Sequence, residues 1–360
     1  MSGTSSCGMI PSVSGAKPTG CRAVVDKTVQ HGYNDRSDLS TTKPCEYHAA
    51  FFTSWNTFNR AGSEFEVKMG LGEVMFAFFD FLDERLTLSI VDVGAAEMAQ
   101  ERDAYAGVLA YPDTTVYGFE PNPQACAARN AASPSNRRFL PYFVGDGAAG
   151  VFHECENPLT SSLYEPNSEL LERFQRIMLP VVRKTPVQTI RLDDTGIADV
   201  DYLKLDIQGA ELDAINGAPQ MLANVLVVHT EVEFIPIYKF QPLFGDVDVA
   251  LREQGFMFHN FINLFSRQFK PMLYNNSPFS SGSQLLYAEA AIYVRNIAAA
   301  HSLSRVKLLK FATLMHDVYS AFDLVAHILE IYDQRFKGKL LGRYLDQVAT
   351  GLAAPANSGA

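Results

Sequence analysis

Cysteine is scarce in this 360-residue chain, and its few copies follow no pattern. There are five cysteines, an odd number, and none of them forms a CxxC pair. A disulfide framework or a zinc knuckle is therefore not expected, and nothing else in the sequence predicts a metal. Free thiols in a reducing compartment are the simpler interpretation, so we expect a cytoplasmic protein.

Long apolar runs are also missing. No stretch of about 18 or more apolar residues occurs, so no membrane-spanning helix is expected. Residues 1–20 lack both a charged start and an apolar centre, which argues against a secretory signal. Residues 1–45 are rich in Ser, Thr, Gly, Pro and charged side chains, so we predict a flexible N-terminal arm there.

Basic residues are fewer than acidic ones. The chain has 30 Lys and Arg residues and 40 Asp and Glu residues, which gives a net charge of −10. A nucleic-acid duplex favours a basic protein face, so no nucleic-acid partner is expected. The hydrophobic share of 47% excludes full disorder and supplies a large core.

What the sequence does contain is an alternation of short apolar strands with helices. This alternation predicts an α/β fold with a doubly wound, mostly parallel sheet. We place that domain at residues 46–297, a helical C-terminal appendage at 298–350 and a disordered tail at 351–360. The expected strands cover residues 88–97, 115–122, 139–146, 201–211, 224–234 and 284–296.

The ends of these strands carry the candidate site, because ligands of open α/β sheets bind beyond the carboxyl ends of the strands. A dinucleotide would need G-x-G-x-x-G after the first strand, whereas residues 94–99 hold one glycine and an acid. An acid at the end of the second strand can accept both hydroxyls of a ribose. This combination favours S-adenosylmethionine, which carries no phosphate. The strand-end residues are Asp92, Gly94, Glu120, Asp146 and Asp206.

Four segments carry a family resemblance: VDVGAAE, YGFEPN, DYLKLDIQGAELDAINGA and QLLYAEAAIYVR. In this order, over about residues 86–296, they resemble the FkbM-type family of methyltransferases. The resemblance implies a class I, Rossmann-like methyltransferase fold with S-adenosylmethionine as donor and S-adenosylhomocysteine as product. It also implies O-methylation of a hydroxyl on a sugar, polyketide or similar metabolite.

The resemblance assigns roles to single positions. Asp92 and Gly94 match the turn that approaches the methionine part of the donor, and Glu120 matches the ribose acid. The remaining matches are Pro121 and Asn122, which shape the turn after Glu120, Asp146 along the adenine, and Asp206 beside the transferring methyl. The sequence departs from the family pattern at Gln208, where the family often has Glu, and in the first turn, which lacks a second glycine.

The reaction needs a base near the acceptor hydroxyl, and four candidates lie at strand ends: Asp206, His229, Glu231 and Glu233. His229 titrates near neutral pH, although it is more simply a hydrogen-bonded histidine within a strand. Glu231 shares a strand face with Glu233 and is expected to line a cleft. Asp206 is expected in the site, although it could also cap the following helix.

The acceptor itself is left open as a small molecule or a glycan. Residues 259–284 read as a long connection whose aromatic and basic side chains would select it. The C-terminal helices are expected either to cover the acceptor pocket or to form a homo-oligomer contact. An N-methyltransferase, a glycan-directed enzyme and a catalytically lost donor-binding or scaffold module are the alternatives.

Overall fold

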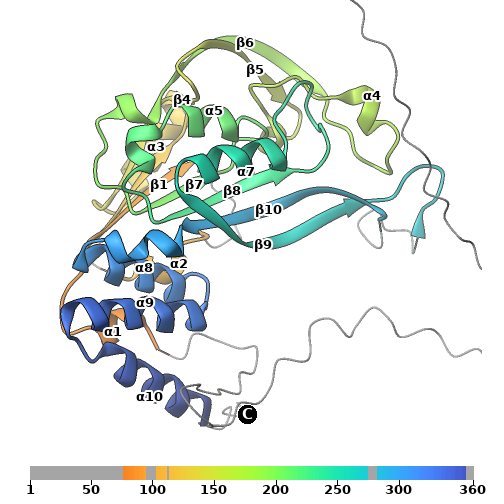
Figure 1. The fold of residues 1–360 in the computed structure, drawn as a ribbon. Coiled ribbons are helices and arrows are strands. Elements are labelled where there is room, and N and C mark those ends of the chain that lie inside the picture. Colours follow the sequence, from red (N-terminus) through yellow and green to blue (C-terminus); the bar gives the residue numbers. More distant parts are fainter. Residues whose placement is uncertain (1–75, 95–102, 112, 275–281, 354–360) are drawn as a thin grey trace, which may run out of the picture. The chain divides into compact units, whose positions relative to one another are not determined.

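A central seven-stranded sheet organises the protein in the computed structural model (Figure 1). The structure describes residues 76–94, 103–111, 113–274 and 282–353, and of residues 351–353 only the backbone. The predicted arm at 1–45 and the side chains of the predicted tail at 351–360 lie outside the described residues. The strand order is β3-β2-β1-β7-β8-β10-β9. The strands are β1 (Leu88–Val93), β2 (Thr114–Phe119), β3 (Arg137–Leu140), β7 (Tyr202–Leu205), β8 (Val227–Glu233), β9 (Phe256–Arg267) and β10 (Gln284–Arg295).

All strands but one run in the same direction. The pairs β3/β2, β2/β1, β1/β7 and β7/β8 are parallel, whereas β10 is antiparallel to both β8 and β9. Strand order reverses at β1, because β2 lies on one side of it and the later β7 on the other. The predicted Rossmann-like, mostly parallel and doubly wound sheet is therefore confirmed.

Helices cover both faces of the sheet. One core packs α5 (Glu211–Asn216), α6 (Pro219–Leu222) and α7 (Phe244–Glu253) against strand side chains such as Leu203 and Leu205. The opposite face, which includes Ile90, Tyr202 and Ile292, packs against the C-terminal helices. Three further helices are α1 (Phe78–Phe81), α2 (Ala106–Leu109) and α3 (Pro123–Ala132), and short 3-10 turns occur at Pro158–Thr160, Leu192–Thr195 and Ile297–Ser302.

A second, three-stranded sheet stands beside the first one and was not predicted. It consists of β4 (Phe143–Val144), β6 (Val181–Ile190) and β5 (Ala149–Cys155), with the helix α4 (Ser168–Leu171) between β5 and β6. The predicted third strand at 139–146 is wrong in extent, because β3 ends at Leu140. Pro141 follows, and a proline cannot donate to a sheet ladder, so the chain leaves the main sheet there.

The edge strand β9 also corrects an expectation. Residues 259–284 read as a connection, but β9 extends to Arg267 and pairs with β10 along most of its length. The strand is rich in aromatic and β-branched residues, such as Phe256, Phe258 and Ile262, which favour a strand.

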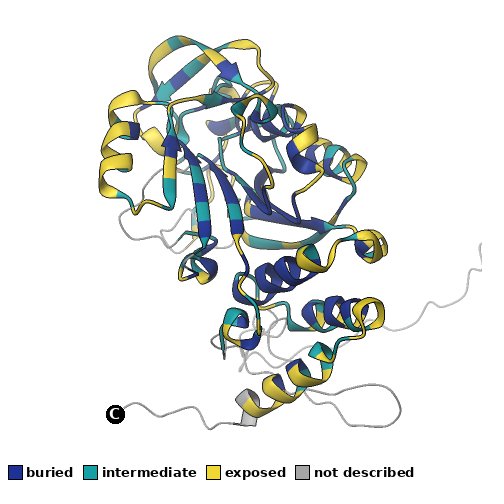
Figure 2. Cartoon of the chain, turned by 90° about the vertical axis from the view of Figure 1, so that its left-hand side faces the viewer, coloured by how far each residue is buried: buried dark blue, intermediate teal, exposed yellow. Residues whose placement is uncertain are grey.

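The C-terminal segment forms three helices: α8 (Arg305–Asp317), α9 (Phe322–Phe336) and α10 (Leu340–Ala353). Burial is concentrated in the strands and in the helices that pack on them, while the last helix is largely exposed (Figure 2). No helix in the described part of the chain is long and apolar enough to cross a bilayer. The cytoplasmic location and the oligomer contact stay predictions.

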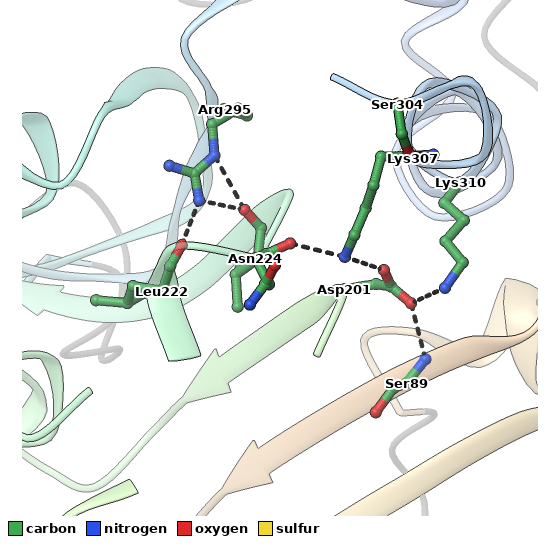
Figure 3. Close-up of polar contacts among 9 residues, drawn as sticks. Ser89, Asp201, Leu222, Asn224, Arg295, Ser304, Lys307 and Lys310 are labelled. Atoms are coloured by element: carbon green, nitrogen blue, oxygen red, sulfur yellow. Dashed lines mark hydrogen bonds and ion pairs between the residues drawn. The ribbon is translucent and has the colours of Figure 1, made fainter. Parts of the chain in front are cut away.

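Helix α8 is fixed to the amino edge of the sheet by a buried carboxylate, Asp201, which precedes β7 (Figure 3). Lys307 Nζ lies 2.7 Å from its Oδ1, and Lys310 Nζ lies 2.7 Å from its Oδ2. The backbone N–H of Ser89 donates to the same Oδ2 over 3.1 Å. Each oxygen of this buried acid thus has a charged partner, as burial of a charge requires.

Candidate active site

A cleft of about 1340 Å³ lies over the carboxyl ends of β1, β2 and β7. This is the position that the strand-order reversal predicts for a ligand. The structure brings eight of the predicted site residues to this cleft, which are Asp92, Gly94, Glu120, Pro121, Asn122, Asp206, His229 and Glu231.

Asp146 is the predicted site residue that does not line the cleft. Its side chain is exposed, and its Oδ1 accepts a hydrogen bond of 2.8 Å from the backbone N–H of Ala148. The cause is the early end of β3 at Leu140, which moves Asp146 from a strand end into a turn beyond β4.

Gly94 holds the end of β1 against the end of β7. Its φ is +84°, and a Cβ at this position would lie 1.7 Å from the carbonyl oxygen of Asp206. The glycine is therefore required by the close approach of two strands as well as by its backbone conformation. The rest of the first turn, including Glu97, lies outside the described residues.

The acid after β2 lies in a turn that starts a helix. Glu120 Oε1 accepts a hydrogen bond of 2.9 Å from the backbone N–H of Asn122. Asn122 Oδ1 in turn accepts from the N–H groups of Gln124 and Ala125, each over 3.0 Å, and so caps α3. Asn122 is used by the helix, while Glu120 faces the cleft.

A buried lysine lies at the centre of the floor, in a row with residues of neighbouring strands. Lys204 of β7 pairs with Asp92 of β1 on one side and with His229 of β8 on the other. Its Nζ lies 3.4 Å from Asp92 Oδ1 and 3.3 Å from Asp206 Oδ2, and Tyr105 donates 2.8 Å to Asp92 Oδ2. Burial would lower the pKa of Lys204, but the two carboxylates outweigh it and raise that pKa.

Sequence reasoning missed Lys204 as a site residue. The available signal was a charge inside an apolar strand, YLKL, where a lysine needs partners. Its side chain is 16% exposed, so the ammonium keeps contact with the cleft.

Two acids of the site have pKa values shifted in opposite directions. Gln208 Nε2 lies 3.1 Å from Asp206 Oδ1 and 2.5 Å from Glu231 Oε2, and so links the two side chains. Burial works against the charge of Asp206, but Lys204 and its hydrogen bonds lower its pKa, so Asp206 is ionised. Burial and the charge of Asp206 raise the pKa of Glu231 well above its usual range, so Glu231 is protonated.

Two further acids lie near Glu231, and one of them, Glu233, also lines the cleft. Burial raises the pKa of Glu233 well above its usual range and that of Glu211 to about 7. Glu211 also accepts the N–H groups of Ile207 and Gly209, over 2.7 Å and 2.9 Å, at the start of α5. Despite these acids, no group of metal-ligand geometry occurs among the described residues.

His229 faces the cleft from β8 and is neutral. Its Nδ1 lies 3.2 Å from the hydroxyl of Tyr319 in the turn between α8 and α9. Burial and then the charge of Lys204 lower the pKa of His229 to about 3. A base works best with a pKa near the operating pH, so this environment disfavours His229 as the base.

Comparison with known proteins bears on this geometry. Residues 92–258 match the family model described as the methyltransferase FkbM domain. This stretch of the chain is therefore similar to an FkbM methyltransferase domain. The predicted resemblance and the enzyme class, a methyltransferase, are thereby confirmed. A curated relative, "2-O-methyltransferase NoeI" of Sinorhizobium fredii, is 29% identical over 176 residues, which cover 44% of this chain and 70% of the relative.

Two solved structures show weak overall similarity. One is a putative methyltransferase from Thermoplasma acidophilum, with 11% identity, a TM-score of 0.30, and coverage of 59% of this chain and 70% of the other. The second is methyltransferase FkbM from Methylobacillus flagellatus KT, with 13% identity, a TM-score of 0.28, and coverage of 61% and 47%. The fold assignment rests on the strand order, since scores of this size carry no argument.

The FkbM domain contains all eight predicted residues of the cleft, but it does not complete the site alone. Tyr287 of β10 lines the cleft and stacks on Phe265 of β9, with ring centroids 4.7 Å apart. Tyr319 reaches His229 from the C-terminal helices. All three residues lie beyond residue 258. Tyr287 belongs to the segment QLLYAEAAIYVR and Phe265 to residues 259–284, both noted in the sequence, whereas no motif marked Tyr319.

Proposed function

We propose that this protein is an S-adenosylmethionine-dependent O-methyltransferase that acts on a hydroxyl of a sugar, polyketide or similar metabolite. The observation that carries the proposal is a pair of acids, Glu120 and Asp206, at the ends of β2 and β7, which face one cleft of an FkbM domain. The curated relative, a 2-O-methyltransferase, supports a hydroxyl as the acceptor.

The chemistry of the cleft fits this donor. Glu120 stands where an acid accepts ribose hydroxyls, and its Oε2 has no hydrogen-bond partner among the described residues. Asp206 is ionised and gives this end of the cleft a negative charge, which suits the positive amino group and sulfur of the donor. When bound, S-adenosylmethionine supplies a methyl group on a positively charged sulfur.

We place the acceptor hydroxyl near Asp206 and Glu231, because these side chains can accept or donate a proton. Asp206 is partly exposed and its pKa is lowered, so it is the carboxylate best suited to take the proton of an acceptor hydroxyl. The raised pKa of Glu231 favours its protonated form, and its hydrogen bond with Asp206 helps to lower the pKa of Asp206. The stacked pair Phe265 and Tyr287 offers an apolar wall for the acceptor.

Calorimetric titration of S-adenosylhomocysteine into the purified protein tests the donor assignment. We expect micromolar binding that Glu120→Ala weakens by about 10-fold or more, because hydrogen bonds to a charged group contribute about 1.5–3 kcal/mol. Glu253→Gln, at an exposed position of α7 outside the cleft, is the control and should bind like wild type. No binding by the folded wild-type protein would refute the proposal.

A further inference from the structure

Three polar groups from distant parts of the chain form one hydrogen-bonded series behind the cleft. The hydroxyl of Tyr202 in β7 lies 2.9 Å from the hydroxyl of Tyr319, which lies 3.2 Å from His229 Nδ1. The rings of Tyr202 and Tyr319 are stacked, with an interplanar angle of 24°. Tyr202 is completely buried, so its hydroxyl is closed to solvent.

The protons of this series can be counted. Each tyrosine hydroxyl carries one proton, and a buried hydroxyl needs an acceptor for it. If His229 Nδ1 donated to Tyr319, then Tyr319 would donate to Tyr202, and the proton of Tyr202 would have no acceptor among the described residues. If instead Tyr202 donates to Tyr319 and Tyr319 donates to His229 Nδ1, both hydroxyl protons have an acceptor. Only the second arrangement leaves no buried hydroxyl proton without a partner.

We propose that Tyr319 is a positioning residue that fixes the Nε2–H tautomer of His229, so that His229 presents a hydrogen-bond donor to the cleft. A neutral imidazole whose Nδ1 accepts a bond carries its proton on Nε2. His229 then has no free lone pair on the cleft side and does not act as the base. The low pKa of His229 agrees with a ring that stays neutral.

The turn after α8 holds Tyr319 in place. Ser320 has a left-handed backbone, with φ +52°. Its N–H donates to the carbonyl of His316 over 3.1 Å, and the N–H of Ala321 donates to that of Met315 over 2.9 Å. These bonds satisfy the last carbonyls of α8 and fix the chain on both sides of Tyr319. The C-terminal helices thereby act on the cleft without contributing a wall to it.

The Nε2–H group of His229 can donate a hydrogen bond to an oxygen atom of a ligand. His229 Nε2–H and the Lys204 ammonium, from paired positions of β8 and β7, are the two donors on this part of the floor. Under the proposed function, on which this step rests, the oxygen belongs either to the donor's carboxylate or to the acceptor. Titration of S-adenosylhomocysteine into His229→Phe separates the two sources, because weaker binding assigns the oxygen to the donor and unchanged binding assigns it to the acceptor.

Long-range ¹H–¹⁵N NMR of the ¹⁵N-histidine-labelled protein tests the proposal without requiring methyl transfer. His229→Gln assigns the signals of His229. At pH 7 we expect an unprotonated Nδ1 and a protonated Nε2 in wild type. In Tyr319→Phe we expect the Nδ1 signal to shift and the other tautomer to appear. Tyr344→Phe, which removes another buried hydroxyl of the C-terminal helices, should leave these signals unchanged.

Several results would overturn the proposal. A protonated Nδ1 in wild type would do so even if Tyr319→Phe failed to fold. Equal spectra for Tyr319→Phe and Tyr344→Phe would show that Tyr319 does not set the tautomer. Failure of the proposed function is a separate result, because it would appear as absent binding of S-adenosylhomocysteine while the tautomer remained as expected.

Discussion

Two aspartates flank β7, and the structure treats them in opposite ways. Asp201 precedes the strand at the amino edge of the sheet and is 0% exposed, with two lysines and a backbone N–H on its oxygens. Asp206 follows the strand at the carboxyl edge, and its side chain is 41% exposed with Lys204 at 3.3 Å. An aspartate is therefore buried and fully paired at the amino edge of the sheet, which we call the closed edge. At the carboxyl edge, the open edge, an aspartate is partly exposed.

The difference shows where this fold gains stability and where it retains reactivity. A buried charge is tolerated when its hydrogen bonds are complete, as they are around Asp201. At the other edge the acids Asp206 and Glu231 share the amide of Gln208. Burial and the charge of Asp206 raise the pKa of Glu231, whereas Lys204 lowers that of Asp206. Perturbed pKa values of this kind are typical of functional sites.

The largest effect is expected from removal of the charge at the closed edge. Asp201→Asn leaves Lys307 and Lys310, with side chains 19% and 11% exposed, without their counter-charge. We expect a loss of about 3–5 kcal/mol in the free energy of unfolding, measured by urea titration. Glu84→Gln is the control, because it breaks an exposed ion pair with Arg305, which lies in α8 like Lys307 and Lys310. It should lower the free energy of unfolding much less. Equal losses of unfolding free energy in the two variants would contradict the view that the buried Asp201 stabilises the fold more than an exposed ion pair does.

At the open edge, activity should change while stability does not. Asp206→Asn removes the ionised carboxylate that we assign to the proton of the acceptor hydroxyl. We expect kcat for methyl transfer to fall by about 100-fold or more, with the urea midpoint close to that of wild type. A stability loss as large as that of Asp201→Asn, with kcat preserved, would show that both aspartates are structural.

The smallest effect is a change in pH dependence. The pKa of Glu231 is raised in the folded state, so folding takes up a proton, and this contribution to stability is lost as the pH rises above about 4.5. Glu231→Gln imitates the protonated acid and removes that dependence. We expect the variant to gain stability over wild type at pH 8 and nothing at pH 4. A gain that is the same at both pH values would exclude the protonated state.

Much of the main sheet could be predicted from the sequence because its strands are short, apolar and separated by turn residues. The acids after β2 and β7 followed from the rule that ligands bind at carboxyl ends, and both line the cleft. Asp146 was misplaced because the apolar run 139–146 was taken as one strand, although Pro141 within it indicates a break.

Other features depend on contacts that no local pattern contains. The strands of the second sheet mix charged and apolar residues, as in VVRKTPVQTI of β6, so their alternation is weak. The contact between His229 and Tyr319 joins positions 90 residues apart. Its consequence for the tautomer appears only once the direction of each hydrogen bond is considered.

The reversed strand β10 also has a consequence for synthesis. β9 is made before β10, yet β10 is the only strand beside it in the described sheet. Until residues 284–295 leave the ribosome, the aromatic strand β9 has no sheet partner and presents unpaired backbone groups. Slow translation between the two strands would therefore prolong the period in which the nascent chain is prone to aggregate.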